Sequence, residues 1–184
     1  ALENYKKSIS LKPDYADPFN NLGLALHNQD KFEEAIEVTK KSISLKPDYA
    51  EAHHNLSFRL LRSGRLKEGL NESEWRWKNP QFSSMHQYRN FPQPVWDGKQ
   101  SLNDKRIMIW CEQGIGDTLN WSSCLPLVTS RAKHCILECQ DKLVPLLKRS
   151  FPDVEVKPED RKRDIERDDF DYHLPMGSLY KHFL

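Results

Sequence analysis

Apolar residues recur three and four positions apart along the first part of the chain. Phe19, Leu22 and Leu26 follow this spacing, and the segment Phe32–Leu45 repeats it. Since an α-helix turns once every 3.6 residues, the pattern predicts two amphipathic helices, each with one apolar face. Pro47 cannot continue a helix, so we expect the second helix to end before it.

The helical pattern returns at a fixed interval. Lys6–Ala16 and Lys40–Ala50 carry the identical sequence KKSISLKPDYA. The interval is the length of one tetratricopeptide unit, about 34 residues, a helix–turn–helix that buries its apolar face by stacking on copies of itself. Asp14 and Asp48 stand in the turns, where we expect their side chains to cap the helices that follow.

Individual positions support this period. Within residues 16–49, the residues that match the tetratricopeptide pattern are Phe19, Leu22, Gly23, Leu26, Ala35 and Pro47. The next unit keeps two leucines of the pattern and departs from it at Ser57, Gly69 and Gln81. Such drift is typical of a terminal unit. We predict an α-solenoid of about two and a half repeats over residues 1–77, the end of a longer array.

Asn21 and Asn55 occupy equivalent positions, one repeat apart, on the first helix of each unit. A column of asparagines can hold an extended peptide by its backbone, so a protein or extended peptide is the expected partner. The pair resembles the asparagine ladder in the repeat arm of O-linked N-acetylglucosamine transferase. The alternative is that each asparagine is solvated or bonds to its neighbouring repeat. Further residues predicted to line the groove are His27, Asn28, His54, Phe58 and Arg62.

The charge balance argues against nucleic acid as a partner. The chain has 28 basic and 27 acidic side chains and a net charge of +1, and no basic stripe is interleaved with aromatic residues. No apolar run reaches the length of a membrane span, and no signal peptide opens the sequence. We therefore expect no membrane partner and a cytoplasmic location.

All four cysteines lie in the second half, at Cys111, Cys124, Cys135 and Cys139. No pair has the spacing of a CxxC motif, so we expect small apolar core thiols in a reducing compartment and no bound metal. The weaker alternative is a metal site that His134 forms with Cys135 and Cys139.

The repeat pattern ends at Trp75–Trp77. Residues 78–104 are irregular in pattern and contain Pro80, Pro92 and Pro94. Prolines at this spacing prevent a helix, so we predict an ordered connector that wraps against a neighbouring part of the chain.

In residues 105–184, short apolar runs alternate with helical segments. The predicted strands are 106–111, 134–139, 154–156 and 170–176, and the predicted helices are 117–130, 141–150 and one that begins at residue 178. This alternation implies parallel βαβ units, here a partial Rossmann-like domain, and an overall α + α/β class. The charged run Lys157–Asp169 is predicted to be a solvated loop.

The segment EQGIGD follows the first predicted strand, where ligands bind in parallel α/β domains. Gly114 and Gly116 permit positive φ and let a ligand approach the backbone, while the following helix N-terminus favours anions. Glu112 and Gln113 can hydrogen-bond a polyol, and Asp117 can accept a proton from a sugar hydroxyl. The alternative is a plain strand–helix turn with Asp117 as N-cap. A phosphate-binding P-loop is excluded, because no Gly-Lys-Ser/Thr sequence follows.

From Trp75 onward the chain resembles a family of bacterial proteins in which tetratricopeptide repeats run into a glycosyltransferase-like domain. The segments that carry the resemblance are EWRW (Glu74–Trp77), FPQPVWDG (Phe91–Gly98), EQGIGDTL (Glu112–Leu119), LECQDKLVPLL (Leu137–Leu147) and FDYHLPMGSL (Phe170–Leu179). The resemblance implies the amino-terminal half of a GT-B fold, similar to heptosyltransferases. It places Asp117 at the position of the proposed base that activates the acceptor hydroxyl.

The resemblance also implies a nucleotide sugar as the donor in the parent protein. In such enzymes the donor binds mostly in a second Rossmann-like half, so this chain by itself is expected to be inactive and to hold no cofactor. Family members usually carry aromatic-x-Arg-Tyr on the first helix, whereas Trp121–Cys124 lacks the Arg and Tyr.

The leading interpretation is repeat-mediated protein or peptide binding coupled to a glycosyltransferase-like domain. In it Asp117 acts as the base, and Gly114 and Gly116 shape the acceptor loop. The alternative is a non-catalytic tetratricopeptide scaffold whose α/β half is a remnant, an interpretation that the missing Arg-Tyr pair favours.

Overall fold

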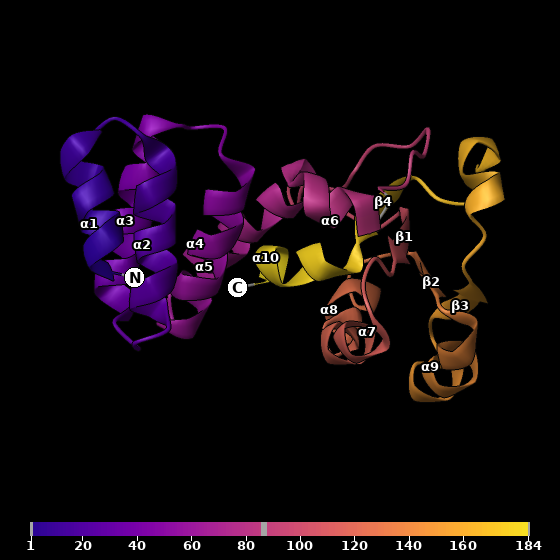
Figure 1. Cartoon of the computed structure of the whole chain (residues 1–184). Coiled ribbons are helices and arrows are strands. Elements are labelled where there is room, and N and C mark those ends of the chain that lie inside the picture. The colour runs from indigo at the N-terminus through magenta and orange to yellow at the C-terminus, as the bar shows by residue number, and fades with distance from the viewer. Residues whose placement is uncertain (1, 86–87, 184) are drawn as a thin grey trace. The chain divides into compact units, whose positions relative to one another are not determined.

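The computed structural model describes residues 2–85 and 88–183. The chain divides into two compact units, Ala1–Met85 and His86–Leu184, each with its own buried core. The first unit is helical and the second is built on a four-stranded parallel sheet (Figure 1). The predicted α + α/β class is therefore confirmed.

The first unit consists of helices that pack in pairs with the predicted period. α2 and α4 begin one repeat apart, at the two alanines that close the duplicated sequence, and each is followed by a second helix that packs on it. The elements are α1 (Leu2–Leu11), α2 (Ala16–His27), α3 (Phe32–Leu45), α4 (Ala50–Arg62), α5 (Leu66–Ser73), the 3₁₀ helix η1 (Glu74–Lys78) and α6 (Pro80–Met85).

Successive helices share apolar residues, so the stack is continuous. Leu22 and Leu26 of α2 pack with α3 in one cluster. Ile36 of α3 packs with Leu56 and Leu60 of α4 in the next. α3 therefore belongs to both clusters, and each buried leucine contributes about 1.5–3 kcal/mol relative to an exposed one.

Helix boundaries correct two expectations. α2 and α4 have Tyr15 and Tyr49 as N-cap residues, and neither helix start has a side-chain cap hydrogen bond. Asp14 and Asp48 are wrong as caps, because each lies one residue too early in its turn. Pro80 does not prevent a helix, because it is the first residue of α6, where a missing N–H costs little.

The second unit contains four strands in the order β3-β2-β1-β4, and every neighbouring pair is parallel. The strands are β1 (Arg106–Trp110), β2 (His134–Cys139), β3 (Glu155–Pro158) and β4 (Tyr172–Pro175). The helices are α7 (Ile115–Ser122), α8 (Leu125–Thr129), α9 (Val144–Ser150), α10 (Leu179–Phe183) and the 3₁₀ helices η2 (Asp141–Leu143), η3 (Arg161–Glu166) and η4 (Met176–Ser178). β2 and β4 lie on opposite sides of β1, so the topological switch point is between β1 and β4.

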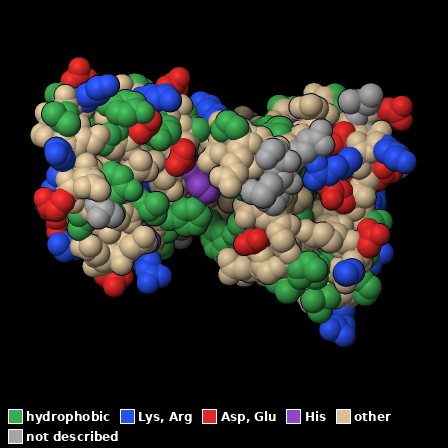
Figure 2. Space-filling model, in the orientation of Figure 1, with side chains coloured by type: hydrophobic (Ala, Val, Ile, Leu, Met, Phe, Trp, Pro, Cys, Tyr) green, Lys and Arg blue, Asp and Glu red, His purple; other side chains and the backbone are tan. Residues whose placement is uncertain are grey.

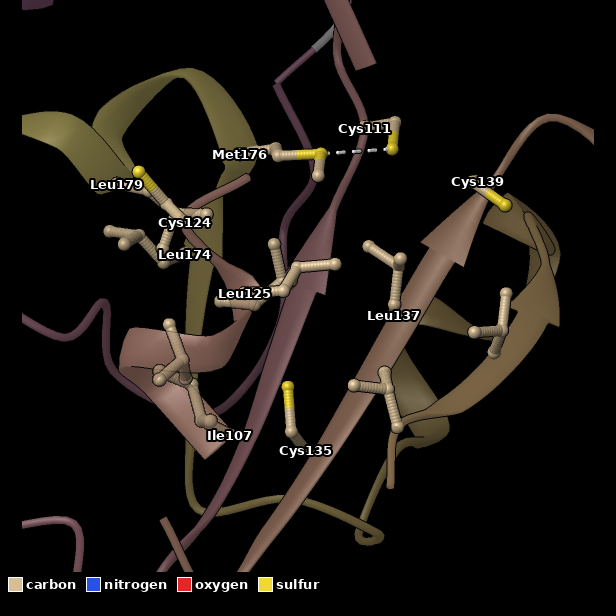
Figure 3. Close-up of a cluster of buried hydrophobic side chains, with 14 of the residues drawn as sticks. Ile107, Cys111, Cys124, Leu125, Cys135, Leu137, Cys139, Leu174, Met176 and Leu179 are labelled. Atoms are coloured by element: carbon tan, nitrogen blue, oxygen red, sulfur yellow. Dashed lines mark hydrogen bonds between the residues drawn. The ribbon is translucent and has the colours of Figure 1, made fainter. Parts of the chain in front are cut away.

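An apolar core covers one face of the sheet (Figure 3). Ile107, Leu137 and Leu174 come from three neighbouring strands. Leu125 of α8 and Leu147 of α9 pack against them. This core holds β1 in place, and the predicted ligand loop follows the carboxyl end of that strand.

All four cysteines are free, buried thiols, and they belong to this core (Figure 3). Burial raises the pKa of Cys111 and of Cys135 to about 12, so both thiols stay protonated at neutral pH. Among the residues that the structure describes, no group of three or more His, Cys, Asp and Glu side chains could hold a metal ion.

A network of charged side chains is buried at the second unit. Glu138 of β2 accepts hydrogen bonds from Arg89 (Nη1 to Oε2, 2.7 Å) and from Arg167. Arg89 also pairs with Asp164 (Nε to Oδ2, 2.9 Å). The expectation of a solvated loop over Lys157–Asp169 is therefore wrong for Asp164 and Arg167, which are buried because partners far along the chain compensate their charges.

The end of the predicted connector extends the sheet. The His173 N–H donates to the Pro94 carbonyl (3.2 Å), and the Trp96 N–H donates to the His173 carbonyl (2.9 Å). Residues 94–96 therefore run beside β4, and Val95 forms a parallel bridge with His173.

No helix within residues 2–85 and 88–183 is long and apolar enough to cross a membrane.

Candidate functional site

The first helices of the two repeat units, α2 and α4, are neighbours and expose matching side chains. Asn21 of α2 is exposed and Asn55 of α4 is half-buried. Three residues after each asparagine stands an apolar side chain, Leu24 with 47% and Phe58 with 56% of its surface exposed. These two also occupy equivalent positions of their repeats. We call the surface that these four residues form the first-helix face.

The two asparagines differ in their hydrogen bonds. Asn55 Nδ2 donates to Asn20 Oδ1 (3.1 Å), and Asn20 Nδ2 donates to Glu51 Oε1 (3.4 Å). Asn20, rather than Asn21, is thus the residue that joins the two repeats, and it is almost fully buried. Asn55 bonds to its neighbouring repeat, as the alternative interpretation held. Its amide still has a second donor hydrogen and an acceptor oxygen for a peptide.

On the face drawn in Figure 2, acidic and basic side chains are interspersed, and neither sign of charge dominates a large area. Basic side chains gather where α2 and α4 end. The His27 ring lies edge-on to Phe32 (centroids 5.4 Å apart), and the Arg62 guanidinium lies 5.8 Å from the same ring. Arg59 donates from Nε to the Gly23 carbonyl (3.3 Å). The three basic side chains therefore share one small region.

Burial has electrostatic consequences in this region. Only 2% of the Arg59 surface is exposed, and its burial lowers the pKa to about 10. Partial burial and the charges of Arg59 and Arg62 lower the pKa of His27. Arg59 Nη1 and His27 Nδ1 are buried and have no hydrogen-bond partner among the described residues.

The remaining predicted groove residues lie nearby along the helices. Asn28 is the exposed C-cap of α2. His54 is half-buried, and its ring meets Phe58 edge-on with centroids 4.8 Å apart. Burial and the charge of Arg76 lower the pKa of His54. All the predicted groove residues thus belong to α2 and α4 or follow α2 directly.

Acidic side chains mark the start of the same helices. Asp17 and Glu51 stand at the second position of α2 and α4. Burial together with these two charges raises the pKa of Tyr49 to about 12.

Sequence reasoning missed Leu24 and Arg59. The equivalent repeat positions of Leu24 and Phe58 could have revealed the first, but the burial of Arg59 is set by the neighbouring repeat.

The EQGIGD loop joins β1 to α7. Gly114 is the N-cap residue with φ −71°, and the Asp117 carboxylate accepts a hydrogen bond from the Gly114 N–H (Oδ2, 3.2 Å). Neither Gly114 nor Gly116 adopts the positive φ that a glycine permits. Asp117 is exposed and stands at the third helical position, where its carboxylate satisfies the N-cap N–H; this is one half of a capping box, because Gly114 has no side chain to supply the other.

Space around the loop is uneven. A Cβ atom added to Gly116 would meet no heavy atom within 4 Å, so this side is open. Gln113 is half-buried, and its carbonyl accepts from Gln140 Nε2 (2.7 Å). Glu112 is buried, and a Cβ on Gly177 would lie 2.6 Å from its Oε1. Glu112 therefore lies between the carboxyl ends of β1 and β4, at the switch point.

Comparisons with known proteins identify the repeats. A family model described as "Tetratricopeptide repeat" matches residues 16–49, and one described as "TPR repeat" matches residues 1–30. The predicted tetratricopeptide repeats are thereby confirmed. One matched relative is protein FlbA of Caulobacter vibrioides, 28% identical over an alignment of 158 residues that covers 83% of this chain and 26% of FlbA. The chain thus spans about a quarter of that protein.

Solved structures with similar parts have TM-scores near 0.4. The crystal structure of MamA is 26% identical and has a TM-score of 0.39, with 40% of this chain and 43% of MamA covered. The TPR2B domain of yeast Sti1 in complex with pHsp70 is 23% identical and has a TM-score of 0.41, with 46% of this chain and 70% of the TPR2B chain covered. A mutant O-GlcNAc transferase of Thermobaculum terrenum is 14% identical and has a TM-score of 0.41, with 88% of this chain and 38% of the transferase covered.

Proposed function

We propose that the first-helix face binds an extended segment of a partner protein. The observation that carries the proposal is the matched pair Leu24 and Phe58, apolar side chains exposed at equivalent positions of two stacked repeats. Each is three residues from an asparagine, Asn21 or Asn55. A peptide on this face would bury apolar side chains on the pair and bond its backbone to the amides.

Peptide selection on the intact chain tests this proposal. A phage-displayed peptide library is selected on the wild-type protein, and the enriched peptides are measured by fluorescence anisotropy. Replacing both Leu24→Ser and Phe58→Ser should weaken binding at least about tenfold, because two apolar contacts are lost. Leu66→Ser on α5, where the leucine is 48% exposed, is the matched control and should bind normally. Failure to enrich any peptide, or equal binding by the double variant, would contradict the proposal.

We further propose that the second unit contributes to sugar transfer in a longer protein. The supporting observation is the loop at the β1/β4 switch point, where Asp117 is exposed beside the open side of Gly116. In this proposal the acceptor hydroxyl binds at the loop and Asp117 takes its proton. The acceptor oxygen bonds to the anomeric carbon of a nucleotide sugar, the bond from that carbon to the phosphate breaks, and the nucleotide leaves. The missing Arg-Tyr pair on α7 keeps the non-catalytic scaffold as the competing function.

Asp117→Asn in the full-length protein separates the two functions. An asparagine oxygen can still accept the hydrogen bond from the Gly114 N–H at the start of the helix, but it cannot act as a base. Sugar transfer should therefore fall at least about 100-fold while the melting temperature stays unchanged. Full activity of this variant would rule out Asp117 as the base. A wild-type protein that no nucleotide sugar stabilises in a thermal-shift screen would favour the scaffold.

A further inference from the structure

Arg59 is a buried cation without a compensating anion among the described residues. Its side chain is almost fully buried between the two repeats, where Nε donates to a backbone carbonyl of α2. No carboxylate of residues 2–85 or 88–183 forms an ion pair with it, and Nη1 has no acceptor there. An unpaired guanidinium in such a place costs stability, because buried charges need partners.

Two more basic side chains converge on Arg59. His27 lies close enough for Arg59 and Arg62 to depress its pKa, and it too has a buried nitrogen without a described partner. Arg62 lies on the same side, over the ring of Phe32. Asp30 raises the pKa of His27, whereas the two arginines lower it. One acidic side chain thus faces two arginines, so positive charge is in excess in this part of the described structure.

Helix dipoles explain only part of this arrangement. The C-terminal ends of α2 and α4 favour nearby cations, which accounts for an arginine in the last turn such as Arg62. They do not account for nitrogens of Arg59 and His27 that are buried without hydrogen-bond partners. Arg59 Nη1 is a donor, and His27 Nδ1 is one in the tautomer that carries the proton there, so the two match the oxygens of a bound carboxylate or phosphate.

We propose that His27, Arg59 and Arg62 form an anion subsite of the first-helix face, for an acidic or phosphorylated side chain of the bound peptide. The inference rests on the proposed peptide binding. Arg62 stands four residues after Phe58 on α4, so the two lie on the same side of the helix and the anionic residue would lie close to an apolar residue of the peptide. Asp17 and Glu51 at the opposite ends of the helices repel the same anion, which gives the bound peptide one preferred direction.

Defined peptides test the subsite. The probes are short capped Ser/Ala peptides with one leucine and, a few positions away on either side, a glutamate, a phosphoserine, a glutamine or a lysine. At the best spacing, the glutamate or phosphoserine peptide should bind at least about tenfold more tightly than its glutamine counterpart, and the lysine peptide more weakly still. The comparison of glutamate with phosphoserine shows which anion is preferred.

Variants of the subsite separate binding from stability. Arg59→Met should remove the anion preference and also raise the melting temperature, because an apolar side chain replaces an uncompensated charge. Arg62→Ala, at a less buried position, should reduce the preference without affecting folding. Lys41→Ala on the second helix α3 removes an exposed positive charge elsewhere and should change nothing.

The outcomes distinguish the two proposals. Equal binding of glutamate and glutamine peptides, or an unchanged anion preference in both arginine variants, would overturn the subsite while leaving peptide binding intact. No binding by any of the peptides and none by a selected library would overturn the proposed function. As a direct check, titration with sodium phosphate should shift the Arg59 Nε–Hε signal in ¹H–¹⁵N spectra, and no shift would count against the subsite.

Discussion

At the scale of single residues, burial decides which polar groups can change charge. His173 of β4 is almost fully buried, and its Nδ1 accepts a hydrogen bond from Trp110 Nε1 (3.2 Å). Burial and the charge of Arg89 lower its pKa to about 4. The bond needs Nδ1 unprotonated, so protonation of that nitrogen would abolish it.

The His173 environment predicts a loss of stability in mild acid. The pKa is near 6.5 in the unfolded chain and about 4 in the folded one. Below pH 6.5 the unfolded state therefore binds a proton that the folded state does not, and stability falls until the pH is below 4. The full loss is about 3 kcal/mol.

Urea unfolding of the second unit at pH 7, 6, 5 and 4 measures this loss. His173→Asn removes the titrating group and keeps an acceptor for Trp110, so its stability should depend less on pH over this range. Parallel pH curves for variant and wild type would show that other groups cause the acid sensitivity.

At the scale of elements, the helices and strands were largely predictable, but their ends were not. The alternation of apolar runs identified all four strands of the described sheet and β2 to the residue. The sequence does not predict α6, because Pro80 argues against a helix unless it is the first helical residue, which needs no N–H donor. The caps at Asp14 and Asp48 were wrong because side-chain type does not fix where a helix starts.

The charged network ties separate segments to β2, so removing its centre should destabilise the second unit. Glu138→Gln removes the buried carboxylate that joins the two arginines and leaves Arg89 with Asp164 and Arg167 with Asp169 as single charged partners. Because a buried ion pair is broken at each arginine, we expect a loss of about 3 kcal/mol in the free energy of unfolding. Glu155→Gln on β3 is the control, since that carboxylate is 42% exposed and its ion pairs are worth little. A Glu138→Gln variant with unchanged stability would show that the network is not needed for folding.

At the scale of the whole molecule, the chain is two units, each held by its own core. This organisation predicts that a core defect stays within its unit. Leu56→Ala removes a buried side chain from the cluster that joins α3 and α4 and should cost about 2–5 kcal/mol. Hydrogen exchange followed by mass spectrometry should show lost protection within residues 2–85 and normal protection within residues 88–183. Lost protection in both units would mean that they unfold together.

The sequence by itself determined the repeat, the fold class and the position of the EQGIGD loop. These features follow from local periodicity: the turn of a helix, the length of a repeat and the alternation of strands with helices. Asn21, Asn55 and Phe58 could be named in advance, because equivalent positions of a repeat lie on equivalent surfaces.

Only the tertiary structure decided which polar groups are buried and with what. Asn20 joins the repeats, Arg59 is enclosed without a described counter-ion, and Glu138 joins Arg89 to Arg167, which are far apart in the sequence. None of this is visible in spacing along the chain. The free energy of a buried charge depends on partners that packing brings from distant segments, and those partners are set by the fold as a whole.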